Sequence, residues 1–153
     1  MSSHPSRCLV TGGAGFIGSH VVDRLLALGH EVRVVDNLST GRRENLAHVA
    51  NRIDFQLGDL CEPADAARAV DGIEVIYHIA ALPSVPRSLK DPWGSHDANV
   101  NATVHLLQAA VKAGTRRVVY SSSSSVYGDT PELPKVESFG SSGVSPYTEL
   151  ELE

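Results

Sequence analysis

The glycine-rich segment LVTGGAGFIGSH, residues 9–20, has residue types and a spacing that point to chemistry. Its glycines are Gly12, Gly13, Gly15 and Gly18, and the segment lies between an apolar run and a stretch with helical periodicity. Glycines in that place allow a tight turn, a close approach of the backbone to a pyrophosphate, and close packing of a helix on a strand. Free amides at the helix N-terminus then favour the negative charge of the pyrophosphate. The segment therefore predicts a dinucleotide-binding site.

An acidic residue follows at the end of the next apolar run. Asp36 lies 21 residues after Gly15, at a place where a carboxylate accepts hydrogen bonds from the adenosine ribose and repels a 2′-phosphate. This favours NAD over NADP. Arg42 and Arg43 could contact a phosphate, but their place at the start of the next predicted helix favours solvated side chains. The alternative for the whole pattern is a structural turn followed by a surface aspartate.

A tyrosine in the segment SPYTELELE, residues 145–153, is a candidate acid or base. A free tyrosine has a pKa of about 10, so it acts near neutral pH only where its surroundings favour the phenolate. Four residues after Tyr147, on the same face of a helix, stands Glu151. A carboxylate there would raise the pKa of the phenol rather than lower it.

Five runs rich in Val and Ile are predicted as strands, and segments of helical period lie between them. The strands are predicted at 7–11, 31–36, 53–59, 74–80 and 116–122, and the helices at 16–29, 42–50, 63–72 and 91–114. Because strands and helices alternate, the connections are right-handed crossovers and the sheet is parallel. The sequence predicts an α/β fold, a doubly wound parallel sheet of the Rossmann type. We expect one domain over 1–153, in which 129–153 is a surface loop and the start of the tyrosine helix.

The composition excludes several function classes. A net charge of -5 argues against nucleic acid as a partner. No stretch is long and apolar enough to cross a membrane, and the N-terminus lacks a signal-peptide layout, so we expect a cytoplasmic protein. The seven histidines show no metal-ligand spacing, so no metal is expected and they are interpreted as surface or core residues.

Six motifs in order, TGGAGFIG, DNLSTG, GDL, HIAA, VVYSSSSSVYG and SPY, make the chain resemble the extended short-chain dehydrogenase/reductase superfamily. Within it, the chain resembles the NAD-dependent epimerase/dehydratase family, from Arg7 to about Tyr147. Segments 80–92 and 127–137 look most like UDP-N-acetylhexosamine and UDP-glucose 4-epimerases. Decarboxylases and dehydratases of nucleotide sugars are the alternatives within the family. The resemblance implies NAD as cofactor, a UDP-hexose or UDP-N-acetylhexosamine as partner, transient oxidation of the sugar at C4, and, for full-length members, frequent homodimers.

The resemblance also implies roles for residues at the carboxyl ends of the strands. Cofactor contacts are expected from Gly12, Gly15, Phe16, Ile17, Gly18, Asp36, Asn37, Asp59, Leu60, Ala80, Ala81, Leu82 and Asn99. Among these, Asp59 would accept from the adenine amino group, and Asn99 would tie the long fourth helix to the neighbouring strands. Ser84, Arg87 and Ser124 would contact the nucleotide sugar. The alternatives are a strand end for Asp59, core packing for the small residues, and a solvated loop for Ser84 and Arg87.

Ser123 and Tyr147, 24 residues apart, match the catalytic pair that the resemblance implies. Family members carry a lysine four residues after the tyrosine, which favours the phenolate, and this chain has Glu151 there. The family's later strands and C-terminal substrate lobe are not in the sequence, and for the five strands that remain the resemblance implies the order 3-2-1-4-5. We therefore expect either an NAD-dependent nucleotide-sugar epimerase cut short after its cofactor half, or a non-catalytic NAD-binding module.

Overall fold

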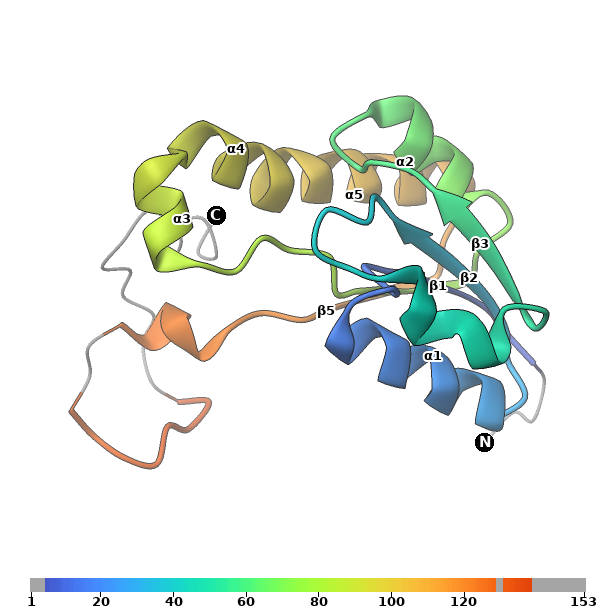
Figure 1. Ribbon diagram of the computed structural model, residues 1–153, viewed down its shortest axis with the longest axis horizontal. Helices are drawn as coiled ribbons and strands as arrows, with labels where there is room; N and C mark the ends of the chain where they lie inside the picture. The colour runs from blue at the N-terminus through green and yellow to red at the C-terminus, as the bar shows by residue number, and fades with distance from the viewer. Residues whose placement is uncertain (1–4, 129–130, 139–153) are drawn as a thin grey trace.

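The computed structural model describes residues 5–128 and 131–138, and its centre is a five-stranded sheet (Figure 1). The strands are β1 (Arg7–Thr11), β2 (Glu31–Asp36), β3 (Ile53–Leu57), β4 (Val75–His78) and β5 (Arg117–Tyr120). They lie in the order β3-β2-β1-β4-β5, and every neighbouring pair is parallel. The predicted fold class and strand order are confirmed.

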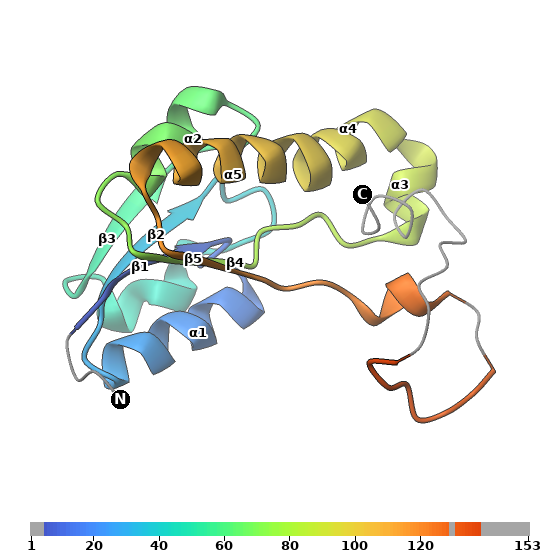
Figure 2. The ribbon, with the colours of Figure 1, turned by 180° about the vertical axis from the view of Figure 1, so that it is seen from behind.

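Helices cover both faces of the sheet, as the two opposite views show (Figures 1 and 2). Helix α1 (Phe16–Ala27) and the 3₁₀ helix η1 (Arg43–Val49) lie on one face, and α2 (Pro63–Val70) and α5 (Ala102–Ala113) lie on the other. From β1 through β2 to β3, the chain moves toward one side of the sheet. From β3 through β4 to β5, it moves toward the other side. Because both sets of connections are right-handed, they cross opposite faces. The sheet therefore has a switch point between β1 and β4.

Two apolar cores sandwich the sheet, and β1 contributes to both. Cys8 and Val10 pack with α1 and η1, whereas Leu9, which points the other way, packs with α2 and α5. Alternate residues of a strand point to opposite faces, so a strand covered on both sides must be apolar throughout. That requirement explains the continuous apolar run CLV at the centre of β1.

Three strands end earlier than the sequence predicted, and for β4 the reason is visible. The strand was expected to reach Ala80, but it ends at His78. The backbone amides of Ile79 and Ala80 each donate to the Thr11 hydroxyl, at 3.1 Å. This side-chain acceptor takes the place of a neighbouring strand and turns the chain out of the sheet. Strands β3 and β5 likewise end before residues 59 and 122, their predicted boundaries.

The helix predicted over 91–114 is divided into three parts. Helix α4 (Pro92–His96) is followed by one π-helical turn, η2 (Asp97–Asn101), and then by α5. The π turn buries Asn99, whose side-chain oxygen accepts from the Leu82 amide at 2.8 Å. A one-turn π helix inserts an extra residue and redirects a side chain, here toward the segment after β4.

Two short helices lie outside the helices that the sequence predicted. Helix α3 (Val85–Lys90) begins after Ser84, whose hydroxyl accepts from the Arg87 amide at 3.2 Å and so caps the helix. The 3₁₀ helix η3 (Ser124–Tyr127) begins after Ser123. Both lie beyond the carboxyl ends of β4 and β5, side by side in both views (Figures 1 and 2).

The core on the α5 side gives a stability prediction. Leu106 is fully buried and its neighbour Leu107 is 42% exposed. Leu106→Ala is therefore expected to lower the free energy of unfolding by about 2–5 kcal/mol, through lost burial and the cavity left behind. Leu107→Ala removes the same atoms from the surface and should cost less than about 1 kcal/mol. Urea unfolding of both variants measures the difference, and equal losses would contradict this assignment of the core.

Candidate functional site

A cavity of about 320 Å³ opens at the carboxyl ends of the strands. Most of its wall comes from the loop between β1 and α1, the turn after β2, the connection after β3 and the segment after β4. The cavity surface includes all but one of the residues predicted for cofactor contact, namely Gly12, Gly15, Phe16, Ile17, Gly18, Asp36, Asn37, Asp59, Leu60, Ala80, Ala81 and Leu82. Four separate segments of the chain thus meet where the sequence placed a dinucleotide.

The loop after β1 approaches other backbone so closely that side chains are excluded at two positions. Gly12 has a φ of +65°, and a Cβ there would lie 2.8 Å from the Cα of Ala80. A Cβ at Gly18, in the first turn of α1, would overlap the carbonyl oxygen of Gly12. The absence of side chains leaves a bare backbone surface at the N-terminus of α1, which is the cradle that a pyrophosphate needs.

The carboxylate of Asp36 holds this loop in place. One of its oxygens accepts from the Ala14 amide at 2.9 Å, and the other accepts from the Leu38 amide at 2.8 Å. The side chain is buried, yet it also lines the cavity. Because each carboxylate oxygen can accept more than one hydrogen bond, Asp36 keeps acceptor capacity toward the cavity.

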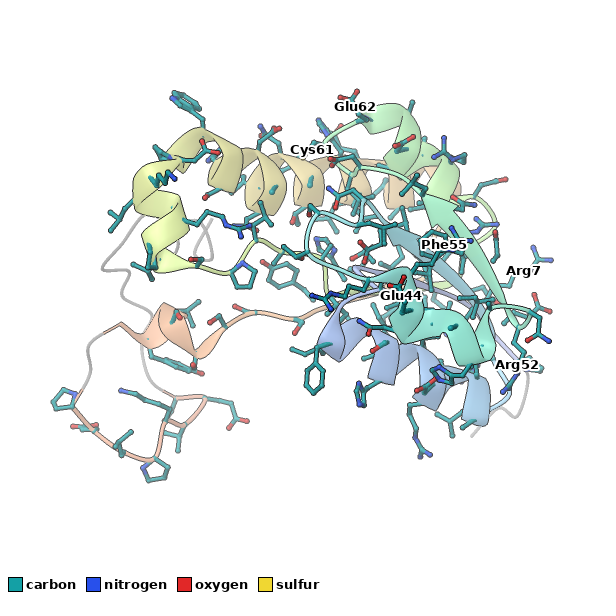
Figure 3. All side chains as sticks on the ribbon, viewed as in Figure 1. Arg7, Glu44, Arg52, Phe55, Cys61 and Glu62 are labelled. Carbon is teal, nitrogen blue, oxygen red and sulfur yellow. The ribbon has the colours of Figure 1, made fainter. Side chains whose placement is uncertain are left out.

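The segment after β2 closes around the same loop from the other side. The Ala14 carbonyl accepts from the Arg42 amide at 3.0 Å and from the Asn45 side-chain amide at 2.8 Å. Arg43 places its guanidinium over the ring of Phe55, which is labelled in Figure 3, at 4.4 Å from the ring centre. Neither arginine lines the cavity, and both are exposed, in line with the solvated positions expected from the sequence.

Asp59 forms the part of the wall that follows β3. Its carboxylate accepts from the Asn37 side chain at 3.0 Å and from the Cys61 amide at 2.9 Å. Partial burial opposes ionisation, but these hydrogen bonds prevail and lower the pKa of Asp59 below its ordinary value. Cys61, labelled in Figure 3 on the connection to α2, has its pKa raised to about 12 by burial and by the carboxylates of Asp59 and Asp97. Its thiol is therefore protonated at neutral pH.

Asn99, the remaining predicted cofactor residue, lies behind the cavity surface. It is buried, and its side-chain oxygen accepts from the Leu82 amide while its nitrogen donates to the Leu82 carbonyl at 3.5 Å. It therefore fixes a wall residue. This agrees with the expected tie between the long helix and the strands.

A buried histidine lies below the same wall. His78, which is 2% exposed, has both ring nitrogens hydrogen-bonded, to the hydroxyls of Thr11 and Thr103. Burial lowers the pKa of His78 from its ordinary value of 6.5 to about 4. The ring is therefore neutral at physiological pH.

Four residues predicted for catalysis or sugar contact lie in the described part of the chain and do not line the cavity, namely Ser84, Arg87, Ser123 and Ser124. Ser84 caps α3, and Arg87 is exposed. Ser123 accepts from the Ser125 amide at 3.1 Å and donates to the Ser125 hydroxyl at 3.0 Å, while Ser124 is exposed. Tyr147 lies outside the described residues, as does Glu151.

Some cavity residues were not singled out from the sequence. They include Ser39, Thr40 and Gly41 after β2, and Ala98 and Ala102 at the start of the long helix. The first three stand in the motif DNLSTG, so a signal for them was present in the sequence. Nothing local marks Ala98 and Ala102, because their contact with the cavity depends on how the long helix crosses the sheet.

Neither a metal cluster nor a membrane segment is found in the described part of the chain. Over residues 5–128 and 131–138, no group of three or more His, Cys, Asp or Glu side chains could hold a metal ion. Every helix within those ranges is too short or too polar to span a lipid bilayer.

Comparison with known proteins extends these observations. The model of the NAD dependent epimerase/dehydratase family matches residues 8–150. A UDP-glucose 4-epimerase of Mycolicibacterium smegmatis is 47% identical over 146 residues, which are 92% of this chain and 46% of that relative. A UDP-glucose 4-epimerase of Klebsiella pneumoniae is 38% identical over 138 residues, 86% of this chain and 99% of that relative.

Among solved structures, a UDP-glucose 4-epimerase from Stenotrophomonas maltophila, with bound NAD and formylated UDP-arabinopyranose, is similar to the whole described fold. It has a TM-score of 0.90 and 33% identity, covering 96% of this chain and 46% of that protein. The chain spans about half the length of this protein and of the Mycolicibacterium relative.

Acidification is expected to destabilise the chain through His78. An unfolded histidine takes up a proton near pH 6.5 and the buried ring only near pH 4. Between these values the unfolded state binds more protons, so stability falls as the pH decreases. From about pH 7.5 to about pH 5 the loss is about 2 kcal/mol. Urea unfolding at both pH values measures it. His78→Asn lacks the titrating ring, so its free energy of unfolding should fall by about 2 kcal/mol less than that of the wild type over the same pH range. An equal fall in both would show that His78 is not the group responsible.

Proposed function

The chain belongs to the NAD dependent epimerase/dehydratase family, and from that membership we propose that its single domain binds NAD and takes part in the 4-epimerisation of a UDP-sugar. The observation that carries the proposal is the cavity at the carboxyl ends of the strands, where predicted cofactor residues from four segments share one surface. Open parallel sheets bind nucleotides at this edge, beside the switch point of the strand order.

The cavity suits a dinucleotide in each of its parts. The backbone at Gly12 and Gly18 leaves room for a pyrophosphate at the N-terminus of α1. Asp36, whose oxygens keep acceptor capacity, would bind the adenosine ribose and disfavour a 2′-phosphate. The wall formed by Asp59 and Leu60 would hold the adenine. Ala80 and its small neighbours would line the path of the nicotinamide.

The proposed reaction divides its roles between the cofactor and the chain. When bound, NAD supplies a hydride acceptor for C4 of the sugar. Tyr147 is proposed to remove the proton from the sugar hydroxyl, assisted by the Ser123 hydroxyl. Ser84, Arg87 and Ser124 are proposed to contact the UDP-sugar, since they belong to segments just beyond the carboxyl ends of β4 and β5.

A second candidate, a non-catalytic NAD-binding module, is favoured by one feature of the sequence. Glu151 stands where the family resemblance implies a lysine. A carboxylate four residues after Tyr147 on a helix opposes formation of the phenolate. In this alternative the cavity binds NAD but no sugar is converted. A cytoplasmic location is part of both proposals, and the free thiols of Cys8 and Cys61 fit a reducing compartment.

Calorimetry with NAD tests the cofactor proposal. We expect NAD to bind to the chain more tightly than NADP, because Asp36 would face the 2′-phosphate. Gly18→Ala should weaken NAD binding at least tenfold, since the added methyl displaces α1 from Gly12. Val22→Ala, in the same helix but buried in the core, is the control: it lowers stability without changing NAD affinity. Absence of NAD binding by the folded wild-type chain would contradict the proposal.

A turnover assay separates the epimerase from the binding module. We expect interconversion of UDP-glucose and UDP-galactose to be slow in the wild type, because a carboxylate at Glu151 would oppose ionisation of the Tyr147 phenol. Glu151→Lys should increase the rate about tenfold or more and shift the optimum to lower pH, since each pKa unit corresponds to about 1.4 kcal/mol. Glu149→Lys makes the same charge change two residues after Tyr147, which on the expected helix is another face, and should have little effect. If neither the wild type nor Glu151→Lys interconverts the two UDP-sugars while both bind NAD, the result supports the non-catalytic NAD-binding module.

A further inference from the structure

The carboxyl ends of β1 and β4 are joined to α5 by a buried chain of hydrogen bonds that passes through His78. Its Nδ1 lies 2.6 Å from the hydroxyl oxygen of Thr11, and its Nε2 lies 2.9 Å from that of Thr103. The ring of Tyr120 covers it, with 5.6 Å between the ring centres. His78 does not itself line the cavity, so any effect of the ring on the cavity passes through its neighbours.

The hydroxyl of Thr103 determines which nitrogen of His78 carries the proton. Thr103 donates its hydroxyl hydrogen to the Asn99 carbonyl, at 2.7 Å. Its oxygen can therefore only accept from His78, which requires a hydrogen on Nε2. A neutral imidazole has one N–H, so Nδ1 must be the acceptor. The ring is thereby fixed as the neutral Nε2–H tautomer.

The hydroxyl of Thr11 completes the chain at the other nitrogen. Because Nδ1 accepts, Thr11 donates its hydrogen to the ring, and its oxygen is free to accept. It accepts from the amides of Ile79 and Ala80, each at 3.1 Å. The histidine thus sets the orientation in which Thr11 serves both amides. An imidazolium would present a second donor to a hydroxyl whose acceptor sites are already used.

Both branches of this series of hydrogen bonds end on the segment Ile79–Leu82, which lines the cavity. The Thr11 branch holds its first two amides. The Thr103 branch bonds the Asn99 backbone, and the Asn99 side chain holds the Leu82 amide at 2.8 Å. The same segment packs against Gly12 in the loop after β1.

We propose that His78 is a positioning residue for the cofactor cavity: as the neutral Nε2–H tautomer it orients Thr11 and Thr103, and through them it fixes the wall segment Ile79–Leu82. The inference rests on the proposed binding of NAD in that cavity. A histidine that only filled space would be replaceable by a side chain of similar volume, whereas a positioning histidine is replaceable only where the donor or the acceptor is kept.

Two conservative variants separate the branches. In His78→Asn the carboxamide oxygen stands near the place of Nδ1 and still accepts from Thr11. In His78→Gln the amide nitrogen reaches the place of Nε2 and still donates to Thr103. Amide chemical shifts of the ligand-free full chain are expected to change at Leu82 in the Asn variant, and at Ile79 and Ala80 in the Gln variant. His78→Leu, which keeps neither bond, should change all three.

NAD affinity provides the functional measurement. His78→Leu and Thr11→Val are each expected to weaken NAD binding about tenfold, which is about 1.4 kcal/mol and close to the value of one hydrogen bond. Thr115→Val is the matched control, because it removes another hydroxyl that donates within the fold, to the Ile73 carbonyl at 3.1 Å, before the amino ends of β4 and β5 and away from the cavity. It should leave NAD affinity within about twofold.

The nitrogen-15 spectrum of His78 gives a readout that packing alone does not produce. At neutral pH, Nε2 should be protonated and Nδ1 unprotonated. The proposal is overturned by an Nδ1–H or doubly protonated ring, by the same amide shifts in the Asn and Gln variants, or by a Thr11→Val chain that binds NAD as Thr115→Val does. If the wild type binds no NAD, the cofactor proposal fails, and the amide shifts of the ligand-free chain still decide the role of His78.

Discussion

The cavity depends on one close contact, between the backbone of Gly12 after β1 and that of Ala80 after β4. A Cβ at Gly12 would lie 2.8 Å from the Cα of Ala80, so no other residue lets the two strand ends come together in this way. Beyond the contact, the chain after β1 turns toward one face of the sheet and the chain after β4 toward the other. The cavity is the space that these diverging paths leave, which is why it lies at the switch point.

Asp36 couples the geometry of this site to its chemistry. The carboxylate proposed to select NAD is also the acceptor for the amides of Ala14 and Leu38. Replacing it by a side chain without two acceptor oxygens would leave at least one of these amides unpaired, and for the buried Ala14 amide the cost is about 1–3 kcal/mol. A change of nucleotide preference at this position is therefore inseparable from a change in the glycine loop, and a second substitution would be needed to satisfy the Ala14 amide.

The sequence predicted the parallel sheet from apolar periodicity and alternation of elements, and the glycine loop and Asp36 from their spacing. The strand order and the cavity residues after β3 and β4 were predicted from the resemblance to the family. The sequence-based prediction was wrong where a contact with a distant part of the chain determines the local structure. The end of β4 depends on Thr11, which comes from β1, and the π turn depends on the pairing of Asn99 with Leu82. His78 was interpreted as a surface or core residue, since nothing near it in the sequence indicates its two threonine partners. The hydrogen bond from the Asn45 side chain to the Ala14 carbonyl was not predicted, for the same reason.

The charge distribution explains why the packing of the glycine loop matters so much. Within the described part of the chain, the residues that line the cavity include Asp36 and Asp59 but neither lysine nor arginine. Arg43, one of the two arginines that could contact a phosphate by their place in the sequence, packs on Phe55 instead. A pyrophosphate in this cavity would therefore be stabilised by backbone amides and the dipole of α1, not by an ion pair. Such dipoles act over short distances and fall off within the first turn of a helix. Binding of an anion by a chain with a net charge of -5 then depends on how closely the backbone approaches it, and the contacts of Gly12, Gly18 and Ala14 are what maintain that approach.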